Sequence, residues 1–210
     1  ALQKAIAGLS AHTSATITVV GHSIGGLVAH AALSDKHQST VASIGNDLQL
    51  VTIATPFAGV RKARHCVSTF MKLVTLGLSG PTCRAISGDK WHEITHASVF
   101  IREPGLLASN VSQHLKIATD EEHACKSLLG LGPCLPGGYV FTLQEQFHPL
   151  IDEQNPVTLA VIKAGHREII DSEKLASVLA RTGMIGAPTG RLAINAMEST
   201  TPAYGQKIRL

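Results

Sequence analysis

The chain has 210 residues, of which 44% are hydrophobic and 16% charged, and this balance excludes an intrinsically disordered protein. Its 18 basic and 15 acidic residues give a net charge of +3 without any basic block, so a nucleic-acid-binding surface is not expected. No apolar run approaches the roughly 20 residues that a membrane span requires.

The first predicted elements surround a serine at position 23. Helical spacing of apolar residues predicts a helix over residues 1–10, a β-branched run predicts a strand over 16–20, and a second apolar helix covers 27–33. The segment between that strand and helix reads Gly-His-Ser-Ile-Gly-Gly and contains the pattern Gly-x-Ser-x-Gly. In this context the pattern is typical of a nucleophile elbow, a turn so tight that the residues beside the serine must be small. We therefore predict that Ser23 is a nucleophile.

A second buried strand is predicted over residues 48–53. Strand, helix and strand in succession form a βαβ unit, so the sheet should be parallel. The next segment, residues 60–111, is far longer than a usual connection between strands and contains helical stretches broken by Gly80-Pro81 and Pro104-Gly105. We interpret it as a helical cap over the active site. Extra helices packed on the sheet, with no role in substrate access, are the alternative.

The C-terminal half contains further strands and helices. The pattern predicts strands over residues 113–118 and 139–143, and helices over 157–164 and 172–181. From residue 183 onward the chain is rich in Gly, Pro, Thr and Ser, and no element is predicted there. We therefore expect one α/β domain over residues 1–182 and a tail of uncertain structure over 183–210.

A nucleophilic serine needs a base to accept its proton and an acid to orient that base. In α/β sheets such groups lie at the carboxyl ends of the strands. Asp120 directly follows the strand predicted over 113–118, and His148 follows the strand predicted over 139–143. We therefore predict Asp120 as the acid and His148 as the base, in the chain order serine, acid, histidine that is typical of a nucleophile elbow.

Other acids and histidines remain candidates. His123 shares a loop with Asp120, and His166 lies beyond a predicted helix with no predicted strand before it. An error of one or two residues in register would replace Asp120 by Glu121 or Glu122, and Glu103 becomes a candidate acid if residues 99–101 form a strand. His22, directly before the serine, is expected to shape the elbow or the pocket and to bind substrate rather than to act as the base.

Four cysteines, Cys66, Cys83, Cys125 and Cys134, allow three pairings. Proximity along the chain favours Cys66–Cys83 and Cys125–Cys134, and two such disulfides would indicate an oxidising compartment and a secreted protein. Four free thiols in a cytosolic enzyme are the alternative. No cysteine or histidine spacing matches a zinc site.

Four segments together resemble the α/β-hydrolase superfamily, and within it the lipases and esterases: Gly21–Val28, Ala54–Gly59, Ala118–Glu121 and His148–Asp152. The resemblance implies hydrolysis of carboxylic esters through an acyl-enzyme, with the Ile24 backbone N–H in the oxyanion hole and with no metal or organic cofactor. Relatives carry several strands before the elbow, but only 22 residues precede Ser23 here. We therefore expect N-terminal strands, and with them a second oxyanion donor, to be missing from this chain.

The leading functional hypothesis is a serine hydrolase of the lipase or esterase kind, acting on acyl or lipid esters whose acyl chain the 60–111 segment would bind. A thioesterase or acyltransferase would use the same three residues. A catalytically inactive, hydrolase-like binding module is a third interpretation. The sequence does not indicate the oligomeric state.

Overall fold

The computed structural model describes residues 1–61, 93–124, 140, 142–153, 157–184 and 207–209. The elements, in chain order, are α1 (Leu2–Ser10), β1 (Ile17–His22), α2 (Ile24–Ala32), η1 (Asp35–His37), α3 (Gln38–Ala42), β2 (Leu48–Ile53), α7 (Val99–Arg102), β3 (Val111–Thr119), α8 (Glu121–Ala124), η3 (Gln144–Gln146), α9 (Pro149–Asp152), β4 (Val157–Ile162), α10 (Glu173–Thr182) and β5 (Lys207–Arg209). The predicted helices over 1–10 and 172–181 and the predicted strands over 16–20, 48–53 and 113–118 are confirmed.

Within the described residues, five parallel strands form one sheet in the order β1-β2-β3-β4-β5. The predicted parallel α/β sheet is therefore confirmed. Each strand pairs with the next strand along the chain, so β1 and β5 lie at the two edges of the sheet. The tail after residue 183 contributes β5, which pairs with β4 and which the sequence did not predict. The division of the chain at residue 182 stays a prediction.

Strand register brings the carboxyl ends of β1 to β4 to a common edge. His22 at the end of β1 pairs with Ile53 at the end of β2, and Ile53 pairs with Ile117 on β3. The last residue of β3, Thr119, pairs with the last residue of β4, Ile162. Residues that directly follow these four strands are therefore neighbours in space.

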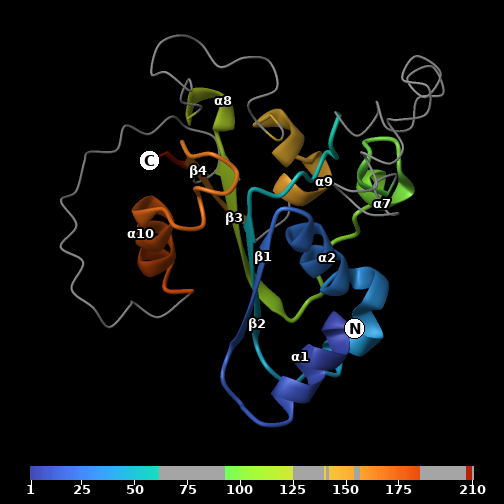
Figure 1. Ribbon diagram of the computed structural model, residues 1–210. Coiled ribbons are helices and arrows are strands. Elements are labelled where there is room, and N and C mark those ends of the chain that lie inside the picture. Colours follow the sequence, from blue (N-terminus) through green and yellow to red (C-terminus); the bar gives the residue numbers. More distant parts are fainter. Residues whose placement is uncertain (62–92, 125–139, 141, 154–156, 185–206, 210) are drawn as a thin grey trace.

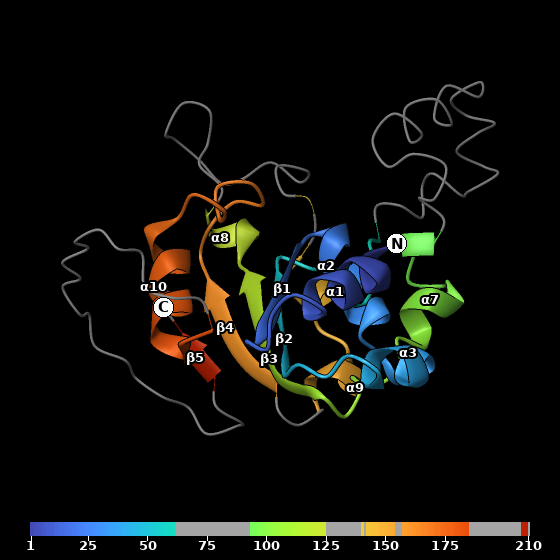
Figure 2. The same cartoon turned by 90° about the horizontal axis from the view of Figure 1, so that it is seen from below.

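Helices cover both faces of the sheet (Figures 1 and 2). Helices α1, α2 and α3 lie on one face, where their apolar residues and those of β1 and β2 form one core; its members include Ile6, Ala29, Leu33, Val41 and Leu50. Helix α10 covers the opposite face and packs on β2, β3 and β4 through a second core; its members include Val51, Leu115, Ile162, Leu175 and Val178. A third, smaller cluster joins α2, α7 and α9 through Leu27, Ile101 and Ile151.

Two predicted elements of the C-terminal half are wrong. The predicted helix over 157–164 is strand β4, whose residues Val-Thr-Leu-Ala-Val-Ile are mostly β-branched or apolar and suit a buried parallel strand. In the predicted strand over 139–143, the described residues Val140, Thr142 and Leu143 belong to a bend, an irregular segment and a turn. A short apolar run has no periodicity that separates strand from helix, and this ambiguity accounts for the error.

Other expectations fall outside the described residues. Within the predicted cap at 60–111, residues 62–92 are not described, and Val99–Arg102 form the short helix α7. All four cysteines lie outside the described residues as well, so both predicted disulfides stay predictions. In the part of the chain that the structure describes, no helix is long and apolar enough to cross a membrane.

His30 on α2 is buried, with 1% of its surface exposed, and within the described structure its Nε2 has no hydrogen-bond partner. Its ring centroid lies 6.0 Å from that of the buried His114. Burial lowers the pKa of His30 to about 4; nearby His148 and Lys116 also lower it, while Asp35 raises it. His30 is therefore neutral near pH 7.

A neutral, buried His30 makes the free energy of unfolding depend on pH. In the unfolded chain a histidine binds its proton near pH 6.5, whereas folded His30 binds it only near pH 4. Between these values the unfolded state holds more protons, so the free energy of unfolding falls as the pH falls from about 6.5 to about 4. His30→Leu should reduce this loss by about 3 kcal/mol in urea titrations near pH 7 and near pH 4. Equal losses in both proteins would contradict this role of His30.

Candidate active site

Ser23 occupies the turn between β1 and α2 with φ 57° and ψ −129°. This left-handed region is rarely populated by a residue with a side chain, and such strain is concentrated at functional sites. Two backbone hydrogen bonds hold the turn: the Ser23 N–H donates to the Ile53 carbonyl at 2.9 Å, and the Gly26 N–H donates to the Ser23 carbonyl at 3.0 Å. The predicted elbow geometry is thus present at Ser23.

Glycines allow the strand and the helix to approach closely at this turn. A Cβ at Gly21 would lie 2.6 Å from the Gly26 Cα, and a Cβ at Gly26 would lie 1.9 Å from the Thr55 Oγ1. In contrast, a Cβ at Gly25 would have no heavy atom within 4 Å. Packing therefore requires glycine at 21 and 26, whereas the final glycine of the Gly-x-Ser-x-Gly pattern is not required by the fold.

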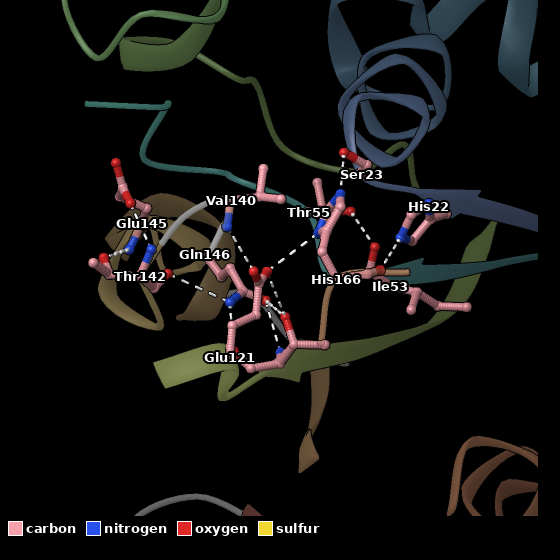
Figure 3. Close-up of polar contacts among 11 residues, drawn as sticks. His22, Ser23, Ile53, Thr55, Glu121, Val140, Thr142, Glu145, Gln146 and His166 are labelled. Atoms are coloured by element: carbon pink, nitrogen blue, oxygen red, sulfur yellow. Dashed lines mark hydrogen bonds and ion pairs between the residues drawn. The ribbon is translucent and has the colours of Figure 1, made fainter. Parts of the chain in front are cut away.

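His166 lies between Ser23 and Glu121 (Figure 3). Its Nε2 is 3.0 Å from the Ser23 Oγ, and its Nδ1 is 3.2 Å from the Glu121 Oε1. A carboxylate only accepts hydrogen bonds, so the Nδ1 carries the proton and donates it. The Nε2 of the neutral ring is then the acceptor for the Ser23 hydroxyl. This is the arrangement in which an imidazole can accept a proton from a serine.

Glu121 is buried, with 3% of its surface exposed, and its carboxylate has several donors. The Oε2 accepts from the Val140 N–H at 2.8 Å, and the Oε1 accepts from the Thr119 hydroxyl at 3.4 Å as well as from His166. A buried carboxylate is costly unless hydrogen bonds compensate for its lost hydration. These contacts hold Glu121 in position against the His166 ring.

Gln146 in η3 stabilises the end of β3, just before Glu121. Its side chain is fully buried. Its Oε1 accepts from the Thr119 N–H at 2.8 Å and its Nε2 donates to the Thr119 carbonyl at 2.7 Å. The Gln146 amide therefore pairs with the last residue of β3 as a neighbouring strand would. Glu121 follows two residues after this fixed point.

The predicted acid and base do not lie at Ser23. Asp120 is instead at the start of α8, where its Oδ1 accepts from the His123 N–H at 3.3 Å and from the His123 ring at 2.7 Å. His148 precedes α9, its backbone N–H donates to Asp152 at 2.8 Å, and its Nδ1 is buried without a partner among the described residues. The structure thus brings Glu121 and His166 to Ser23 in their place.

Each correction has a simple structural reason. Successive residues after a strand point in different directions, so a shift of one residue exchanges Asp120 for Glu121, which is among the alternatives that the sequence leaves open. His166 was kept only as an alternative to His148 because β4 was taken for a helix. His166 follows β4 by four residues, and the rule that placed the base after a strand selects it once β4 is recognised. The signal was the β-branched run Val157–Ile162.

The two remaining predicted residues flank Ser23. Ile24 is the first residue of α2, and its N–H is one of those that have no acceptor within a helix; its oxyanion role stays a prediction. The His22 Nε2 lies 2.9 Å from the His166 carbonyl oxygen (Figure 3). A substrate-binding role for His22 also stays a prediction. Within the described residues, no group of three or more His, Cys, Asp or Glu side chains is arranged to hold a metal ion.

A parallel sheet with helices on both faces and a serine elbow after a strand defines an α/β-hydrolase fold, as the motifs predicted. Residues 3–83 match the family model described as "Putative serine esterase (DUF676)". Among solved structures, the crystal structure of Bacillus licheniformis lipase BlEst2 in mature form is similar, with a TM-score of 0.54 and 15% sequence identity over 87% of this chain and 71% of that chain. None of the curated proteins compared matches the sequence. These findings support an α/β-hydrolase fold of the lipase or esterase kind.

The two glycines after Ser23 provide a matched pair of variants. Gly26→Ala should disrupt the elbow, because its Cβ would overlap the Thr55 side chain. Gly25→Ala should leave stability unchanged or raise it by up to about 1 kcal/mol, since alanine is the better helix former. Thermal unfolding of both variants measures this contrast. A Gly26→Ala protein as stable as Gly25→Ala would contradict the close packing described for the elbow.

Proposed function

We propose that this chain is a serine hydrolase that cleaves carboxylic acyl esters through an acyl-enzyme. The observation that carries the proposal is the pair of hydrogen bonds at His166, which accepts from the Ser23 hydroxyl and donates to the Glu121 carboxylate. The serine–glutamate–histidine order along the chain is one that α/β-hydrolases use. The family description over residues 3–83 and the lipase fold similarity favour an ester as the substrate class.

Acylation begins when the Ser23 Oγ attacks the ester carbonyl carbon and its proton passes to the His166 Nε2. The Glu121 carboxylate, which accepts from the Nδ1, stabilises the resulting imidazolium. Negative charge develops on the former carbonyl oxygen, and the Ile24 N–H at the start of α2 can donate a hydrogen bond to it. The tetrahedral intermediate then breaks its bond to the alcohol oxygen, which takes the proton from His166 and leaves.

Deacylation repeats these steps with water. His166, again neutral, accepts a proton from a water molecule that attacks the carbonyl carbon of the acyl-serine. Collapse of the second tetrahedral intermediate releases the carboxylic acid and returns the proton to the Ser23 oxygen. His166 therefore acts first as a base and then as an acid in each half of the reaction.

The test is hydrolysis of a p-nitrophenyl ester by matched pairs of variants, together with labelling by a fluorophosphonate probe. Ser23→Ala should abolish both. His166→Asn should lower kcat/KM by roughly 10²–10⁴-fold, and Glu121→Gln by roughly 10²-fold or more. The neighbouring controls His148→Asn and Asp120→Asn should retain activity. Circular dichroism verifies that each variant is folded.

Two outcomes would overturn the proposal. A folded wild-type chain that neither hydrolyses the ester nor reacts with the probe would exclude the hydrolase activity. An active enzyme in which His148→Asn loses as much activity as His166→Asn would retain the activity but exclude His166 as its base. Equal losses in Asp120→Asn and Glu121→Gln would likewise exclude Glu121 as the orienting acid.

A further inference from the structure

His22 joins the nucleophile elbow to the segment that carries His166. It is the last residue of β1, directly before Ser23, and its Nε2 lies 2.9 Å from the backbone carbonyl oxygen of His166. The two partners are 144 residues apart in sequence. The contact is therefore a tertiary tie between the residue beside the nucleophile and the backbone of the residue that receives its proton.

The partner atom determines the proton on the His22 ring. A carbonyl oxygen only accepts, so the His22 Nε2 must carry hydrogen and donate. The two imidazole rings also lie against each other, with centroids 4.8 Å apart and planes inclined by 38° (Figure 3). His22 thus contacts His166 twice, once at the backbone and once at the ring.

The segment around His166 lies outside the sheet. It follows β4 after Lys163, Ala164 and Gly165, and its own backbone bonds are those of turns, such as Ile169 N–H to the Gly165 carbonyl at 3.1 Å. A turn segment is less restrained than a strand. The bond from His22 fixes the His166 carbonyl to the end of β1, and so sets the distance between the His166 ring and the Ser23 hydroxyl.

The charge of His22 suits this position. Burial lowers the pKa of His22 and proximity to His166 lowers it further, whereas the hydrogen bond to the His166 carbonyl and the nearby Glu121 raise it. The neutral ring retains the Nε2 hydrogen that the contact needs. It also places no second positive charge beside His166 when His166 takes up the serine proton.

We infer that His22 is a positioning residue, whose Nε2–H bond to the His166 carbonyl holds the proposed base at hydrogen-bonding distance from Ser23. The inference rests on the proposed function, because the rate of ester hydrolysis is what would report the distance between the His166 ring and Ser23. His22 acts through His166 and needs no contact with the substrate.

Two variants separate the donor from the ring. His22→Gln keeps an N–H donor at the same number of bonds from the backbone, and His22→Phe keeps a ring but loses the donor. In p-nitrophenyl ester hydrolysis, His22→Phe should lower kcat by about 10- to 100-fold with KM unchanged. His22→Gln should restore most of that loss. Equal kcat in wild type and His22→Phe, or equal losses in both variants, would overturn the inference.

Whether kcat or KM changes distinguishes a positioning role of His22 from a role in substrate binding. A His22→Phe protein with raised KM and unchanged kcat would assign His22 to substrate binding and overturn positioning. Long-range ¹H–¹⁵N spectra of the histidine rings give a readout that does not depend on activity or on a substituted protein. They should show His22 as the Nε2–H form, and an Nδ1–H form would overturn the inference. A wild-type chain without esterase activity would instead overturn the proposed function, whatever the spectra show.

Discussion

Parallel pairing in register is the constraint on which the rest of the structure depends. Because β1, β2, β3 and β4 end at one edge of the sheet, the residues that follow them meet there although they are far apart in sequence. Ser23 follows β1, Glu121 follows β3 and His166 follows β4. Further hydrogen bonds hold these residues in place at that edge. Gln146 bonds to the end of β3, and His22 bonds the His166 backbone to β1.

The N-terminal half of this arrangement was predictable because its signals are strong and local. The β-branched run before Ser23 and the glycines around it specify a strand, a tight turn and a helix within about a dozen residues. Even here the structure changes the account of the glycines. Gly26, which lies outside the five-residue pattern, contacts Thr55, whereas Gly25 within the pattern has open space.

The residues that contact Ser23 and His166 could not be ranked correctly from the sequence, because each contact depends on one distinction that a short segment does not contain. Val157–Ile162 suits a buried strand or a buried helix by composition, and only its pairing with β3 decides between them. Taking it for a helix left His166 with no predicted strand before it, and so favoured His148 as the predicted base. At the acid, a rotation of one residue decides which carboxylate faces His166, and that rotation is set by α8, which begins at Glu121 and leaves Asp120 to accept from the His123 N–H.

The proposed reaction depends on a His166 ring that donates its Nδ1 proton to Glu121 while its Nε2 faces Ser23. Low-field proton NMR measures this most directly, because a histidine N–H bonded to a buried carboxylate gives a resonance separated from the rest of the spectrum. The account predicts one such resonance that disappears in Glu121→Gln and persists in Asp120→Asn. A resonance that survives Glu121→Gln, or that disappears in Asp120→Asn, would contradict it.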